Sequence, residues 1–411
     1  MRLRHTFTCL SLLTGLLFSP YSIAEVTIER SAAMSLSSLV KSVQERQLAS
    51  LKQTAQQQQV DANTALGNAM FAGTANVNLN HFNDAIGSSD GFQEWESSVD
   101  LPLWLPGQKQ QQLALSDTLS AEIPAYQQRL LLDASATVRS TVWAVVQAET
   151  KVKQSYQVWQ TAQNLEQNVD SRVKAGELAG TEALLASSHA LEMQSRYLQA
   201  KAELDYAWSN YQNYTGKMSL PEKIEESLSE QTVINQKHPY LALLDQQILT
   251  LRAQQDLARF DGAVNPNLSF GLRRERDDYD DDYTNSVGVG ISFALDDEVY
   301  QNPNLANAAS ELADANIERR RIERELQDNL LRLRHQLHSK QQQLELVNKQ
   351  DKTAKQYLLL QQRAFDLGEI DLVSLIRSQS LADEAVNHQT SLQVDIRHAV
   401  ATVNQALGMI P

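Results

Sequence analysis

Two histidines, His335 and His338, are the clearest candidate metal ligands in the chain. Residues three apart lie on the same face of a helix, so both imidazoles could bind one metal ion. They stand in a glutamine-rich segment, however, and no carboxylate lies in register to complete a set of ligands. We therefore expect no metal site here, and we predict no cofactor for the chain.

Patterns typical of catalysis or of nucleotide binding do not appear. The sequence has no nucleophile elbow, no serine, histidine and aspartate in a hydrolase order, and no histidine pair with a metalloprotease glutamate. Gly288-Val-Gly290 resembles part of a phosphate-binding loop, but it lies in an alternating segment and lacks the third glycine. The aspartate-rich run 277–282 lacks the glycine and distal glutamate of a calcium-binding loop, which favours a solvated loop. An enzyme is not expected.

An export signal is predicted for residues 1–24. Two arginines precede an apolar stretch from Phe7 to Phe18, and Ser22 and Ala24 supply small residues before a cleavage site. The apolar stretch is shorter than the ~20 residues that a membrane helix needs. The single cysteine, Cys9, lies within this segment. The mature chain is therefore expected to have no disulfide, thiolate metal site or cysteine nucleophile.

Composition and charge favour an extended, acidic and helix-rich protein. Aromatic residues make up only 6% of the chain, which argues against a few thick hydrophobic cores. The formal charge is −14. Nucleic acid is disfavoured as a partner, because its binding requires a basic surface.

Four short segments alternate between apolar residues and small or polar ones, as strands with two different faces do. In residues 287–295 every odd position is large and apolar and every even position is small. The other three segments are 75–82, 98–105 and 268–273. This alternation is typical of strands in a membrane barrel, with apolar residues facing lipid. The loops 81–93 and 275–285 are too polar for lipid and are expected in water.

Long helices are predicted between these strands. Apolar residues spaced alternately by three and four, as in a coiled coil, run from Leu326 to Phe365, and the same spacing runs from Leu131 to Val173. Residues 108–172 contain no proline except Pro124, and a helix of that length would span roughly 100 Å. A narrow apolar seam of this length predicts helices packed side by side in a cylinder rather than a globular core.

The order of predicted elements occurs twice. Each copy has two strands, a long helix, a glycine-glutamate turn and a second helix, and the turns at Gly176 and Gly368 stand 192 residues apart. We interpret residues 25–214 as the first repeat, 215–237 as a linker and 238–411 as the second repeat.

Four strands are too few to close a barrel, since about eight is the smallest number that closes. An open edge in lipid would leave backbone groups without hydrogen-bond partners at several kcal/mol each. The chain is therefore expected to assemble with further copies of itself. Two, three or four copies would supply 8, 12 or 16 strands, and the residues alone do not choose among these.

With these features the mature chain resembles the TolC family of outer-membrane efflux channels. The matching residues are Asn265-Pro266-Asn267 before the third strand, Pro102-Leu103-Trp104-Leu105-Pro106-Gly107 after the second, and the two glycine-glutamate turns. The resemblance implies an α+β membrane protein with four strands and long antiparallel coiled-coil helices per subunit. It also implies a homotrimer, in which a 12-stranded β-barrel continues into a periplasmic α-helical barrel.

The resemblance further implies a location and partners. These are the outer membrane and its lipid, a long periplasmic extension, a periplasmic adaptor (membrane fusion) protein and an inner-membrane pump. The compact length and the segment around Trp104 are most similar to the heavy-metal, CzcC-like branch, whose pumps are of the resistance-nodulation-division type. No nucleic acid is expected.

Site residues carried over from the family lie at the two turns. Gly176, Glu177, Gly368 and Glu369 correspond to the tip that docks an adaptor, although each glycine could equally serve as a helix terminator. The acidic pair that narrows the periplasmic mouth in other members is replaced here by two different residues. The possible mouth residues are therefore Glu182, Asp371, Ser374 and Arg377.

The function expected on these grounds is a passive exit duct of a tripartite efflux system, with heavy-metal cations as the preferred cargo. Negative charge at a narrow mouth would favour cations. Two transport alternatives are drug efflux and type I protein secretion. A different class of function is a structural coiled-coil tether in the periplasm.

Overall fold

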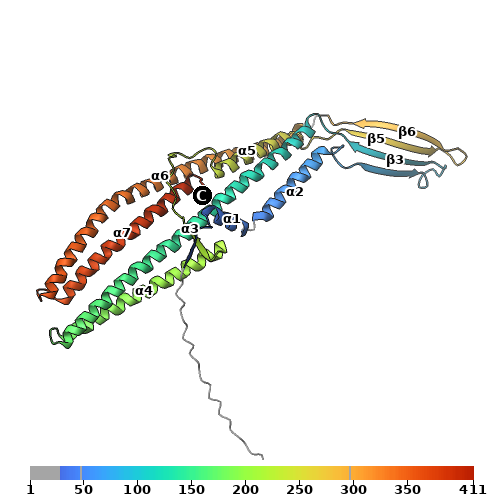
Figure 1. The fold of residues 1–411 in the computed structure, drawn as a ribbon. Coiled ribbons are helices and arrows are strands. Elements are labelled where there is room, and N and C mark those ends of the chain that lie inside the picture. The colour runs from blue at the N-terminus through green and yellow to red at the C-terminus, as the bar shows by residue number, and fades with distance from the viewer. Residues whose placement is uncertain (1–27, 47–48, 296–297) are drawn as a thin grey trace, which may run out of the picture.

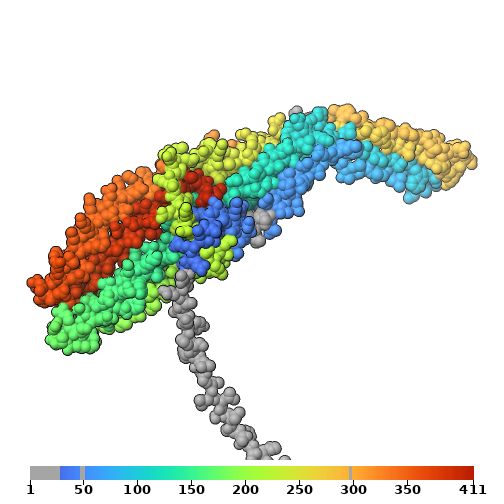
Figure 2. Space-filling model, viewed as in Figure 1, coloured from blue at the N-terminus to red at the C-terminus, as the bar shows by residue number. Residues whose placement is uncertain are grey.

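A computed structural model describes residues 28–46, 49–295 and 298–411. The predicted export signal, residues 1–24, lies outside the described residues. The molecule is elongated, with a four-stranded sheet at one end and two long helical hairpins at the other (Figure 1). Figure 2 shows the same curved outline in space-filling form.

The described elements follow the expected order twice. The first set comprises α1 (Leu36–Arg46), α2 (Ala49–Asn68), β2 (Asn76–Asn83), β3 (Gln93–Pro102), α3 (Gln108–Lys174) and α4 (Gly180–Thr215). The second comprises α5 (Pro239–Ala258), β5 (Asn267–Arg276), β6 (Thr284–Ser292), α6 (Glu298–Asp366) and α7 (Leu372–Ala406). Two helices, α1 and α2, precede the strands of the first set. Among the described helices, none is long and apolar enough to cross a membrane.

The four long strands form one antiparallel sheet in the order β2-β3-β5-β6. The prediction for the second strand was wrong by several residues: β3 begins at Gln93 instead of Ser98 and ends at Pro102. Its first residues are polar and give no apolar alternation, but backbone hydrogen bonds to β2 and β5 hold them in the sheet without regard to side-chain type. Similarly, β6 begins three residues earlier than expected.

One face of the sheet is apolar and solvent-exposed. Its cross-strand neighbours Val77, Val99, Phe270 and Val289 form a row across all four strands. Val77 is 76% exposed and Val289 is 68% exposed. The alternation predicted from the sequence therefore places large apolar side chains on one surface of the sheet.

The opposite face carries small and polar residues. The next row consists of Asn78, Ser98, Gly271 and Gly288, all of them small or polar. Further along this face, Arg273 bonds to the carboxylates of Glu94 at 2.6 Å and Glu275 at 2.7 Å. The two faces thus differ sharply in polarity, as they would if they met different solvents.

Two very long helices dominate the other end. α3 has 67 residues and α6 has 69, so at 1.5 Å per residue each spans about 100 Å. The predicted seam is confirmed in α6, where Leu330, Leu337, Val347 and Phe365 are buried. α6 begins at Glu298, well before the first residue of the predicted seam, Leu326.

The segment predicted as a linker, 215–237, is not a free connection. Ser219–Pro221 forms a short strand, β4, which pairs in parallel with β1 (Glu29–Ser31). Leu220 is fully buried and Ile224 nearly so, in a core shared with α1, α3, α4 and α7. The segment therefore packs against the middle of the helical region, between the sheet and the hairpin tips. We call this region the waist.

A candidate functional site at the hairpin tips

Each helical hairpin turns at a glycine in the left-handed conformation. Gly176 has φ of 82° and Gly368 has φ of 77°. In the first turn, the Gly176 N–H donates to the Val173 carbonyl at 3.0 Å, and the Glu177 N–H donates to the Arg172 carbonyl at 2.9 Å. This pair of bonds is the Schellman motif, which satisfies the last carbonyls of α3.

The second turn repeats this geometry. The Gly368 N–H donates to the Phe365 carbonyl at 3.0 Å, and the Glu369 N–H donates to the Ala364 carbonyl at 2.8 Å. A Cβ added at either Gly176 or Gly368 would have no heavy atom within 4 Å. Both glycines are therefore required by backbone conformation and not by space.

We expect Gly368→Val to lower the free energy of unfolding by about 1–2 kcal/mol, because a β-branched residue is strained at positive φ. Gly180→Val is the matched control, since Gly180 has open space and no positive φ. Unfolding in urea, followed by circular dichroism, measures both variants. Equal stabilities would show that conformation does not explain the glycine. If Gly368→Val assembles normally, its affinity for an adaptor separates a docking defect from a folding defect.

The two tips are packed against each other. Val169 of α3 and Ala186 of α4 share a buried cluster with Phe365 of α6 and Leu372 of α7. The Arg172 guanidinium lies 5.0 Å from the centre of the Phe365 ring and also bonds to Glu177 at 3.1 Å. The expected tip residues from both repeats thus lie at one end of the molecule (Figure 1).

The residues expected at the mouth have different local roles. Asp371 caps the N-terminus of α7, where its Oδ1 accepts from the Ser374 N–H at 2.8 Å. Hydrogen bonds from the Ser374 hydroxyl and backbone N–H lower the pKa of the Asp371 carboxyl, so it is ionised at neutral pH. Glu369, Ser374 and Arg377 are exposed beside it.

The corresponding acidic side chains of the first repeat are either ion-paired or less exposed. Glu177 is paired with Arg172. Glu182 lies in the first turn of α4, where a negative charge is favourable to the helix dipole, and it is half-buried. The structure therefore leaves Glu369 and Asp371 as the exposed carboxylates among the predicted residues without an ion pair to a basic side chain.

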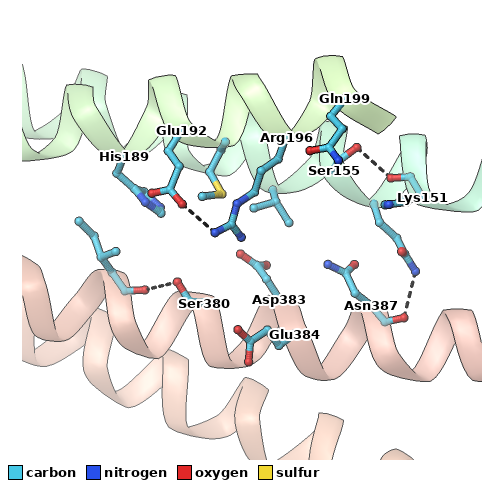
Figure 3. A pocket seen from close by; sticks show the side chains of 14 residues that line it. Lys151, Ser155, His189, Glu192, Arg196, Gln199, Ser380, Asp383, Glu384 and Asn387 are labelled. Atoms are coloured by element: carbon cyan, nitrogen blue, oxygen red, sulfur yellow. Dashed lines mark hydrogen bonds and ion pairs between the residues drawn. The ribbon is translucent and has the colours of Figure 1, made fainter. Parts of the chain in front are cut away.

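A polar cleft between the hairpins was not predicted. It has a volume of about 650 Å³ and is lined by α3, α4 and α7. Figure 3 shows Arg196 of α4 pointing towards Asp383 of α7, while Arg196 bonds to Glu192 at 2.7 Å. Burial raises the pKa of Asp383 to about 6. No sequence signal marks the cleft, because its walls come from segments about 190 residues apart.

The chemistry available in these places is electrostatic. Neither the tips nor the cleft contains a nucleophile paired with a base. Across the part of the chain that the structure describes, no group of three histidine, cysteine, aspartate or glutamate side chains could hold a metal ion. His335 and His338 are both exposed on α6.

Comparison with known proteins gives matches in structure and not in sequence. No protein-family model matches the chain, and no curated protein matches it significantly. The CmeC outer membrane channel of Campylobacter jejuni is similar with a TM-score of 0.68 and 14% identity, over 91% of this chain and 84% of that chain.

Two further solved structures are similar over most of their length. CusC, solved in a study of folding and transmembrane channel formation, has a TM-score of 0.70 and 12% identity, over 91% of this chain and 92% of that chain. The outer membrane protein VceC of Vibrio cholerae has a TM-score of 0.69 and 11% identity, over 91% of this chain and 96% of that chain. The paired long helices and four-stranded sheet described above are therefore the fold of the CmeC outer membrane channel.

Proposed function

We propose that this chain is one subunit of a homotrimeric outer-membrane channel that serves as a passive exit duct. The observation that carries the proposal is the sheet, which has one exposed apolar face and one polar face. Its two edge strands, β2 and β6, pair with no further strand among the described residues. Such a sheet cannot remain open in lipid, because its edge groups would have no hydrogen-bond partners. Three copies would supply 12 strands and close a barrel.

The long helices extend this duct into the periplasm. Helices of about 100 Å are far longer than any membrane or globular core requires. Three copies of two hairpins would surround a central path, with the sheet in the outer membrane and the tips in the periplasm. The similarity to the CmeC outer membrane channel supports this arrangement. A duct of this kind needs no catalytic residue.

The tips are the proposed docking surface for a periplasmic adaptor. Gly176, Glu177, Gly368 and Glu369 are all exposed at the end furthest from the sheet. The adaptor would connect the channel to an inner-membrane pump, which supplies the energy of transport. Heavy-metal cations are the cargo we favour, because the exposed carboxylates at the tip attract cations and the sequence resembles the heavy-metal branch.

Conductance in planar lipid bilayers, together with the mass of the native complex, tests the channel function. The mature protein, extracted from membranes in detergent, is expected as a trimer that produces discrete conductance steps. A structural tether would produce none. A stable, water-soluble monomer without conductance would contradict the proposal. Drug or protein cargo would instead appear as export that depends on a drug pump or on an ATP-driven exporter.

We expect the double variant Glu369→Gln and Asp371→Asn to lower the preference for cations. Asparagine keeps the helix cap at position 371 while removing its charge. Two charges at about 10 Å in water contribute about 0.8 kcal/mol together, which corresponds to roughly a fourfold lower cation preference.

Reversal potentials at low and high salt measure this change, which should shrink as salt screens the charges. Glu45→Gln, an exposed carboxylate on α1, is the control. A reversal potential equal to that of the unmodified channel would remove Glu369 and Asp371 from the mouth.

A further inference from the structure

α4 carries a row of leucines that nothing in the described part of the chain covers. Leu184, Leu191 and Leu198 are spaced by seven residues and are 73%, 63% and 53% exposed. Seven residues complete nearly two helical turns, so the three side chains lie on one face. The buried residues of α4, among them Ala186, Ala190 and Met193, face the other way.

α6 carries a matching row. Leu346 and Leu360 on α6, and Leu367 directly after it, follow the same seven-residue spacing and are 65%, 62% and 75% exposed, and exposed Thr353 on α6 completes the pattern. This row lies away from the seam that packs on α7. Figure 1 shows α6, α7, α3 and α4 side by side in that order, so both rows lie at the outer edges of the helical layer.

The two rows lie at equal residue counts from the glycines of the two hairpin turns. Leu184 lies eight residues after Gly176, and Leu360 lies eight residues before Gly368. Leu191 and Thr353 are each 15 residues from their turns, and Leu198 and Leu346 are each 22 residues away. Leu184 is four residues from the first residue of α4, Gly180, and Leu360 is six residues from the last residue of α6, Asp366. At 1.5 Å per residue these positions lie about 6 and about 9 Å from the helix ends, so the two rows come level to within about 3 Å.

We propose that α4 of one copy packs antiparallel against α6 of the next copy through these rows. The contacting pairs are Leu184 with Leu360, Leu191 with Thr353, and Leu198 with Leu346. The proposal rests on the proposed ring of identical copies and adds the residues and register of its helical interface. Rotation about a ring axis does not change the position of a residue along that axis. Two residues at the same height in one copy are therefore at the same height in neighbouring copies.

The sheet supports the same pairing of edges. Its unpaired strand β2 lies on the α4 side of the molecule and its unpaired strand β6 lies on the α6 side (Figure 1). One rotation would therefore join β2 to β6 and α4 to α6 together. A continuous interface of this kind requires no rearrangement of the chain.

Residues beside the rows are compatible with close packing. Lys349 and Arg363 flank the α6 row and come level with Ser195 and Thr181 of α4. Lys201 flanks the α4 row and comes level with Gln343 of α6, so like charges do not meet. The other residues three or four positions from the leucines of both rows are mostly serine and glutamine, for example Ser187, Ser188, Gln194, Gln342 and Gln350.

Disulfide cross-linking of the full chain in membranes tests this register. The single cysteine is first replaced by Cys9→Ser. The double variants Leu184→Cys with Leu360→Cys, and Leu198→Cys with Leu346→Cys, are then oxidised and separated without reductant. A disulfide requires Cα atoms within about 7 Å. Level pairs facing each other should give covalent dimers and trimers.

Two controls separate register from mere proximity. Leu185→Cys with Leu359→Cys is level with the first pair, but these side chains point to opposite faces of the helical layer. Leu184→Cys with Leu346→Cys lies on the proposed rows but is displaced by 14 residues, or about 21 Å. Both controls should give at least tenfold less cross-linked product.

Native mass spectrometry of the uncrosslinked variants reads the assembly state independently. Trimers that cross-link through the level facing pairs alone would support the proposed register. Trimers that lack these products, or that cross-link equally in the controls, would overturn the register and leave the channel function standing. Monomers throughout would overturn the ring itself.

Discussion

Replacing Arg139 with alanine is expected to lower the free energy of unfolding by about 3–5 kcal/mol, because it leaves the Glu226 carboxylate, only 12% exposed, without its ion-pair partner. Arg139 is 4% exposed and binds Glu226 through two hydrogen bonds of 2.7 and 2.6 Å. The same guanidinium donates to the Ser135 hydroxyl at 2.6 Å and to the Met409 carbonyl at 2.9 Å.

This network connects three distant parts of the chain. Arg139 comes from α3, Glu226 from the segment after β4, and Met409 from the C-terminal end. Loss of the Arg139 network would therefore destabilise the packing of all three parts at the waist, and not one helix alone. Urea unfolding in detergent, followed by circular dichroism, measures the effect.

The control is the neighbouring ion pair of Arg397 and Glu225, which joins α7 to the same segment after β4 at 2.8 Å. Both of its side chains are exposed, so Arg397→Ala should cost at most about 1 kcal/mol. A loss at Arg139 as small as that at Arg397 would show that burial of the pair does not matter. A lysine at position 139 should rescue only partly, because it cannot form two parallel bonds to one carboxylate.

A second large effect is expected at the apolar face of the sheet. Val99→Arg would place a charge at the centre of the row that includes Val77 and Phe270. If this face meets lipid, the charge costs about 2–4 kcal/mol near the middle of the bilayer. The amount of folded protein in the outer membrane should fall accordingly, while its synthesis is unchanged.

Ser98→Arg is the matched control. Ser98 precedes Val99 on the same strand but lies on the polar face, where its neighbours Asn78 and Gly271 leave room for a long side chain. Assembly should survive this change, whereas conductance should change if the face lines the duct. Equal loss in both variants would contradict the assignment of one face to lipid and the other to water.

The faces of the strands and the helical seam could be predicted because each depends on local periodicity. Alternation in residues 287–295 placed large side chains on one face, and the three-and-four spacing through Leu330 and Leu337 identified the side of α6 that is buried. Both patterns follow from the geometry of a single strand or helix and need no knowledge of neighbours.

The ends of strands were less predictable where backbone pairing, and not side-chain type, decides them. The start of β3 at Gln93 depends on backbone pairing with Arg276, far along the chain. The strand β4 has only three residues, and its place is decided by pairing with Glu29–Ser31. No local window contains both partners of such a pair.

The sequence by itself determined the two repeated sets of elements, the strand faces and the glycine turns, because these are set by local spacing and backbone conformation. Only the tertiary structure decided that Arg139 connects α3 to the segment after β4 and to the C-terminal end. It alone also decided that Asp371 is a helix cap and that a polar cleft lies between the hairpins. These features join segments that are far apart in the chain or depend on how one side chain is oriented, and spacing along a sequence specifies neither.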